Sequence, residues 1–73
     1  MKNVRPWKHG ESLALDDTTF IANYYGKLAI VQAPTIIRAW VRAKLYFKVP
    51  DDRVYHLTVS GRDGRWFDSL GQH

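Results

Sequence analysis

The fold class is decided by the stretch Pro34-Thr35-Ile36-Ile37-Arg38-Ala39-Trp40-Val41-Arg42-Ala43, which is the clearest helix in the sequence. Proline suits the first turn of a helix, because its missing N–H would have no intrahelical partner there. Apolar residues cover one face at spacings i, i+1, i+4, i+5 and i+7, namely Ile36, Ile37, Trp40, Val41 and Ala43. Arg38 and Arg42 lie one turn apart on the other side. The helix is predicted to end near Ala43, because Lys44 would fall inside the apolar face.

After this helix the hydrophobic period changes to two. Leu45, Phe47 and Val49 alternate with Lys44, Tyr46 and Lys48, which predicts a half-buried strand over residues 44–49. Pro50-Asp51-Asp52 is a turn sequence, and residues 53–59 are rich in the β-branched and aromatic residues of a second strand. Gly61-Arg62-Asp63-Gly64 is a hairpin signal before a short third strand, Arg65-Trp66-Phe67. A polar tail follows.

On the N-terminal side of the helix the pattern is less decisive. Residues 27–33 are compatible with a buried strand or with a second short helix, since so short an apolar run has no distinctive period. Residues 20–25 are predicted to form a short helix. Asp16-Asp17-Thr18-Thr19 supplies N-cap chemistry before it, and Gly26 is a suitable C′ residue after it. Residues 1–12 are predicted to be an irregular arm.

These elements predict one small α+β domain, with two or three short helices and a small antiparallel β-meander, in a winged-helix-like arrangement. A chain of 73 residues is long enough for one domain. We expect the globular part to span residues 13–68, between the arm at 1–12 and the polar tail at 69–73.

The composition narrows the setting in which the protein works. The chain has no cysteine, so neither a disulfide nor a thiolate metal site is expected. Its N-terminus lacks the apolar segment of a secretory signal. The longest apolar run, residues 28–31, is far shorter than the roughly 18 residues of a membrane span. We therefore expect a cytoplasmic protein without a membrane partner.

Catalytic chemistry is not indicated by any motif. His9, His56 and His73 are scattered, and no pair of them has metal-ligand spacing. The neighbouring carboxylates at positions 16–17 and 51–52 are explained by a helix cap and a turn. Phosphate-binding and nucleophile motifs are missing from the sequence. We therefore expect no enzyme activity, no catalytic residue, no metal and no cofactor.

The charge distribution points to an anionic partner. The net charge is +4, and residues 32–49 contain four basic residues and no acid. Arginine pairs can engage phosphate or carboxylate groups, although any one of them can equally be a solvated surface residue. The candidate residues for contact with a nucleic acid or an acidic surface are Arg38, Arg42, Lys44, Lys48, Arg53, Arg62 and Arg65.

Residues 17–49 resemble the small winged-helix domains of phage excisionases and MerR-like regulators. The resemblance is carried by Ala22 to Gly26 and by Thr35-Ile36-Ile37-Arg38-Ala39-Trp40-Val41-Arg42. It implies that the second helix enters the major groove of DNA and that the hairpin touches phosphate. The segment between the two helices, residues 27–34, is longer and more apolar than in that family.

In length, basicity, lack of cysteine and basic N-terminal arm, the whole chain resembles the small transcription regulators that lytic phages of Xanthomonas direct at host RNA polymerase. This resemblance implies a monomer that binds near the N-terminus of the polymerase β′ subunit, hinders σ-dependent initiation and promotes antitermination. The composition of the arm makes Val4, Arg5, Trp7 and Lys8 candidate protein contacts, with Trp7 either docking on the domain or anchoring the partner. A polymerase-binding regulator is the leading expectation, and a winged-helix DNA-binding protein is the alternative.

Overall fold

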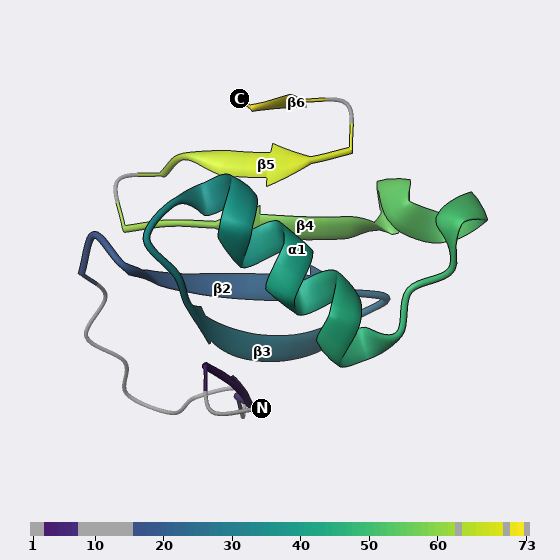
Figure 1. Ribbon diagram of the computed structural model, residues 1–73, viewed down its shortest axis with the longest axis horizontal. Coiled ribbons are helices and arrows are strands. Elements are labelled where there is room, and N and C mark those ends of the chain that lie inside the picture. Colours follow the sequence, from purple (N-terminus) through teal and green to yellow (C-terminus); the bar gives the residue numbers. More distant parts are fainter. Residues whose placement is uncertain (1–2, 8–15, 63, 70, 73) are drawn as a thin grey trace.

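The computed structural model describes residues 3–7, 16–62, 64–69 and 71–72. In this part of the chain an antiparallel sheet carries one α-helix on one of its faces (Figure 1). The elements are β1 (Val4–Pro6), β2 (Thr19–Tyr24), β3 (Lys27–Gln32), α1 (Ile36–Phe47), the 3₁₀ helix η1 (Asp51–His56), β4 (Leu57–Ser60), β5 (Trp66–Asp68) and β6 (Gly71–Gln72). The predicted α+β class, with an antiparallel sheet and two short helices, is confirmed.

The strand order in the sheet is β1-β3-β2-β4-β5-β6. Both β3 and β4 pair antiparallel with β2, so they run in the same direction on either side of it. α1 is the connection between them, and it crosses over β2 (Figure 1). The N-terminus of α1 therefore lies at the end of the sheet with the β4–β5 turn. Its C-terminus lies at the end with the β2–β3 turn and η1 (Figure 1).

The core lies between α1 and the sheet. Alternate residues of the central strands point toward the helix, and the largest fully buried side chains among them are Phe20, Val31, Leu57 and Val59. From α1 the buried residues are Ile36, Ala39 and Ala43. Two of these three are alanines, so the helix backbone can approach the sheet closely.

Both ends of α1 have defined caps. The Thr35 hydroxyl oxygen accepts a hydrogen bond of 3.2 Å from the Arg38 N–H, which fixes the first turn. At the other end Lys48 has a φ of 54°, and Val49 N–H donates to the carbonyl of Lys44 at 3.1 Å, as in a Schellman motif. The prediction of a helix end near Ala43 and a strand over 44–49 was therefore wrong. The apolar residues at 45, 46 and 47 fit a helix turn as well as an alternating strand.

The helix predicted over residues 20–25 is also wrong, since this segment is the central strand β2. Phe20 and Ala22 point toward the core and Ile21 and Asn23 toward the opposite face, so the same residues satisfy a period of two. Gly26 does not follow a helix. It completes a two-residue β-turn with Tyr25, in which both residues have positive φ.

The remaining segments differ from the sequence predictions in smaller ways. Residues 27–32 are a strand, which decides between the two alternatives for this segment. Residues 51–56 form η1, so the strand predicted over 53–59 is confined to β4. The hairpin signal at 61–64 is confirmed, because Gly61 N–H donates to the Arg65 carbonyl at 2.8 Å between β4 and β5. Two residues of the predicted polar tail form β6.

The predicted helix cap at Asp16 is instead a turn that leads into β2. One Asp16 carboxylate oxygen, Oδ1, accepts hydrogen bonds of 2.8 Å from the Thr18 N–H and from the hydroxyls of Thr18 and Thr19. These hydrogen bonds, first of all that from the Thr18 backbone, lower the pKa of Asp16 below its ordinary value of 3.8, and Arg62 adds a small attraction.

This pKa shift predicts how acid affects stability. Because the pKa is lower in the folded state, ionised Asp16 stabilises the fold above pH 3.8, and this contribution is lost as the pH falls through the folded-state pKa. Asp16→Asn should therefore be less stable than the wild type at neutral pH, and the difference should shrink in acid. Thermal unfolding of both proteins across this pH range measures the effect. A difference that stays constant with pH would contradict the role given to the ionised carboxylate.

Candidate protein-binding surface

The outward face of α1 is apolar at its centre. Ile37, Val41 and Leu45 follow one another at intervals of four residues and form a continuous stripe over three turns. Their side chains are 53%, 45% and 58% exposed, respectively. Such a stripe of contiguous exposed aliphatic side chains makes this face of α1 a candidate contact surface. We call these three residues the aliphatic stripe.

Basic residues border the aliphatic stripe, and α1 contains no acidic residue. At 100° per residue, Arg38 and Arg42 project on one side of the stripe and Lys44 on the other, with Lys48 just beyond its C-terminal end. Arg38 and Lys48 are exposed and form no ion pair with any of the described residues. The outward face of α1 therefore combines an apolar centre with a positive border.

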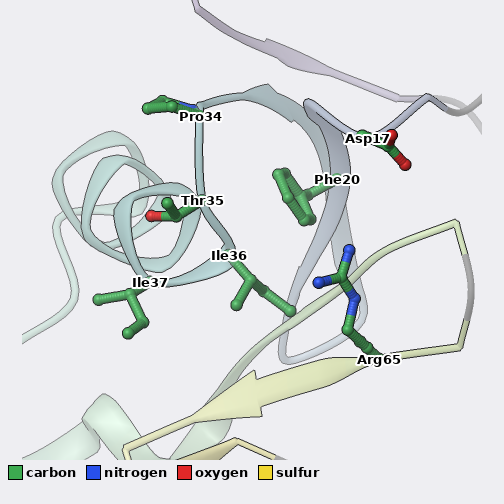
Figure 2. Close-up of a pocket in the computed structure, with 7 residues that line it drawn as sticks. All are labelled: Asp17, Phe20, Pro34, Thr35, Ile36, Ile37 and Arg65. Carbon is green, nitrogen blue, oxygen red and sulfur yellow. The ribbon is translucent and has the colours of Figure 1, made fainter.

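A partly open pocket of about 280 Å³ lies at the N-terminal end of the stripe. Figure 2 shows the Phe20 ring, the Ile36 side chain and the Arg65 guanidinium pointing toward one another. The residues that line the pocket are Asp17, Phe20, Pro34, Thr35, Ile36, Ile37 and Arg65. Ile37 belongs to both the pocket and the aliphatic stripe, so the two form one continuous surface.

The structure divides the predicted basic residues between the two ends of the domain. Arg38, Arg62 and Arg65 lie toward the N-terminal end of α1, whereas Lys44, Lys48 and Arg53 lie toward its C-terminal end (Figure 1). Several of the basic side chains are held by neighbours. Arg42 donates from Nη1 to the Gln32 carbonyl, Lys44 Nζ lies 3.4 Å from Asp51, and Arg62 Nη2 lies 3.2 Å from Asp17. These partners are exposed, so the two ion pairs add little stability.

The N-terminal segment is part of the sheet, which corrects the prediction of an irregular arm. Val4 pairs with Val31 in β1, points into the core and is only 4% exposed, so it cannot contact a partner in the folded protein. Arg5 points to the sheet face opposite α1. The Trp7 ring is half-buried on the domain, and its indole N–H has no hydrogen-bond partner among the described residues. Lys8 lies outside the described residues.

Sequence reasoning predicted the buried face of α1 only in part. Ile36 and Ala43 of the predicted apolar face are buried, whereas Ile37 and Val41 are exposed, and the helix was predicted to end before Leu45. Trp40 is packed against the core, and its indole N–H donates to the Leu57 carbonyl at 3.0 Å. The sequence feature that could have identified the buried face is the pair of alanines, Ala39 and Ala43. Their small side chains suit a close helix–sheet contact better than Ile37 and Val41 do.

The described residues contain no group of three or more histidine, aspartate or glutamate side chains that could hold a metal ion. Of the three histidines, His9 and His73 lie outside this part of the chain, and His56 is exposed in η1. In the same residues, no helix has the length and apolar character needed to cross a membrane.

Comparison with known proteins gives no relative from which a function could be carried over. No family model matches this chain, no curated protein matches it, and no solved structure matches it.

Proposed function

We propose that this chain is a transcription regulator that binds bacterial RNA polymerase through the outward face of α1. The observation that supports this proposal is the aliphatic stripe, which is exposed over three turns and bordered by basic residues on a helix that contains no acidic residue. An amphipathic helix face with anchors at i, i+4 and i+8 is a common way for proteins to recognise each other.

The apolar and basic residues of this surface predict which side chains the partner segment must carry. The stripe requires apolar side chains in the partner, and Arg38 and Lys48 favour carboxylates beside them. The pocket at the end of the stripe combines apolar walls with the Asp17 carboxylate and the Arg65 guanidinium, so it suits an apolar anchor residue. The partner segment is therefore acidic and amphipathic.

The choice of polymerase as the partner comes from the resemblance of the whole chain to small phage regulators of transcription. In that setting the contact would lie near the N-terminus of the polymerase β′ subunit. Occupying this region would hinder σ-dependent initiation and favour antitermination. The proposal moves the contact residues from the N-terminal segment to α1, because Val4 is buried.

Binding of α1 in a DNA groove is supported less well by this surface. The first helix on which the winged-helix resemblance depended is β2, so α1 has no preceding helix to form a helix-turn-helix among the described residues. The centre of the outward face is aliphatic, whereas a groove-binding helix needs polar side chains at the base edges. A protein partner fits these features better.

The proposal is tested with purified bacterial RNA polymerase, treated with nuclease, in a titration against the labelled protein. Val41→Glu places an acid in the centre of the aliphatic stripe, and Arg38→Glu reverses the charge on its border. Each substitution should weaken binding by at least about tenfold, or about 1.4 kcal/mol. Both side chains are on the surface, so the free energy of unfolding should change by only about 0.5 kcal/mol.

Arg5→Glu is the matched control for Arg38→Glu, because it makes the same change of charge on the opposite face of the sheet. Polymerase binding should be unchanged in Arg5→Glu. If Arg5→Glu weakens binding and the α1 variants do not, the contact lies on the N-terminal strand. If the wild-type protein binds no polymerase in this titration, the choice of partner is wrong.

A further inference from the structure

Six aromatic rings form a continuous chain at the end of the domain where α1 terminates. They come from the β2–β3 turn, the last turn of α1 and the end of η1. Successive ring centroids are 5.1 Å apart for Tyr46 and Phe47, 5.8 Å for Phe47 and Tyr24, 4.7 Å for Tyr24 and Tyr25, 4.6 Å for Tyr25 and His56, and 4.3 Å for His56 and Tyr55.

The two halves of this chain have different surroundings. Tyr24, Tyr46 and Phe47 are partly buried and pack against the core. The other three rings face solvent, with Tyr25 55% and Tyr55 57% exposed and His56 also exposed. We call Tyr25, Tyr55 and His56 the aromatic tip. The core is complete without these rings, so their exposure calls for another reason.

The backbone conformation of Tyr25 is a second, independent observation that supports a binding role for this ring. Tyr25 has a φ of 52° and Gly26 a φ of 79°, as in a type I′ turn. Asparagine, aspartate and glycine are the usual first residues of such a turn, and a bulky aromatic residue there is strained. Strained residues of this kind concentrate at binding sites.

Basic residues lie in or next to the elements that carry the aromatic tip. Lys27 follows the β2–β3 turn, Lys48 caps α1, and Arg53 lies in η1. All three are exposed and form no ion pair among the described residues. The nearby acids are Asp51 and Asp52, and Asp51 pairs with Lys44 at 3.4 Å. The tip as a whole is therefore positive.

We propose that the aromatic tip is a stacking platform for the unpaired bases of a single-stranded nucleic acid. Every base has a π-face that can stack on a tyrosine or histidine ring, and the phosphates would lie against Lys27, Lys48 and Arg53. A duplex keeps its bases stacked on one another, so it cannot use the rings. A cationic peptide is disfavoured by the same basic residues. This inference concerns a surface at the end of the domain away from the pocket, and it does not depend on the polymerase contact.

Fluorescence anisotropy tests the proposal with a labelled single-stranded RNA of mixed sequence, a DNA strand of the same sequence, and each strand annealed to its complement. The wild type should bind single strands more tightly than duplex, with an affinity that falls as salt rises. Tighter binding of RNA than of DNA would identify RNA as the ligand, through its 2′-hydroxyls. Equal binding of the single-stranded RNA and the single-stranded DNA would mean that the site accepts either kind of unpaired strand.

Two substitutions remove rings without endangering the fold. Tyr25→Asn installs the residue that a type I′ turn prefers, so thermal stability should be equal or higher. Tyr55→Ser removes an exposed side chain. Each should weaken single-strand binding by about tenfold, which lies within the range found for stacking of one base. Arg53→Gln should weaken binding and also reduce its dependence on salt.

Val41→Ser and Arg38→Gln are the matched controls, with the same kinds of change on the outward face of α1. They should leave single-strand binding unaltered, and the ring variants should leave polymerase binding unaltered. The proposal is overturned if the ring variants bind single strands as the wild type does, if duplex binds as tightly as single strands, or if no nucleic acid binds.

Discussion

Phe20→Ala is expected to lower the free energy of unfolding by about 3–5 kcal/mol, which is the usual range for removal of a buried phenylalanine. Phe20 is 2% exposed in β2 and lies between α1 and the sheet, with Val31 opposite it in β3. The substitution leaves a cavity that the surrounding strands cannot fill, because β2 is paired on both sides. A domain of 73 residues has a total stability of about 4–11 kcal/mol, so this variant should be close to unfolding.

Urea unfolding followed by tryptophan fluorescence measures this loss. Ile37→Ala is the matched control, because it also truncates a large apolar residue but one that is 53% exposed on α1. It should cost less than about 1 kcal/mol, most of the side chain being in water already. Equal losses for the two variants would mean that the outward face of α1 is packed in solution.

The parts of the fold that the sequence predicted correctly are those with an unambiguous local signal. The helix was predicted from its apolar face, although it begins at Ile36 after the Thr35 cap and Pro34 lies before its first turn. The glycines at 61 and 64 define the β4–β5 hairpin. Residues 20–25 carry no such signal. Their apolar residues satisfy the period of a helix and that of a strand, and only pairing with β3 and β4 decides between them. β3 follows β2 after a two-residue turn, but β4 lies beyond α1 and η1 in the sequence, and that pairing cannot be inferred from a local pattern.

The candidate site was also predicted only in part, because its apolar residues cannot be recognised without knowing how α1 packs on the sheet. The absence of acidic residues from positions 32–49 is a property of the sequence, and it identified Arg38 and Lys48 correctly as exposed basic residues. The aliphatic stripe could not be recognised, because a hydrophobic pattern assigns every branched aliphatic residue to the core. Which arc of the helix is buried depends on the sheet, and the sheet selects Ile36, Ala39 and Ala43.

α1 separates the two proposed functions in space. Its outward face and N-terminal pocket are aliphatic and suit a protein segment, whereas the rings beyond its C-terminal end suit flat, unpaired bases. A helix of twelve residues is about 18 Å long, which separates the N-terminal pocket from the aromatic tip, and Lys48 is the residue that the two surfaces share.

Val4→Asp is expected to cost at least about 3 kcal/mol of stability, because it places an unpaired carboxylate in the core next to Val31. Arg5→Ala, one position along the same strand, should cost less than about 1 kcal/mol, since Arg5 is exposed on the opposite face. Thermal unfolding of the two variants makes the comparison within one element.

The same pair of variants decides what the N-terminal segment does. If it were a free arm, both variants would be as stable as the wild type, and any defect would appear in partner binding alone. In the structure the backbone of this segment is bonded to β3. The Asn3 carbonyl accepts from the Gln32 backbone N–H at 2.8 Å, and the Trp7 backbone N–H donates to the Leu28 carbonyl at 3.1 Å. Removing the segment therefore breaks the edge of the sheet. Loss of polymerase binding after such a truncation would report unfolding, so the contact must be mapped with the surface variants of α1.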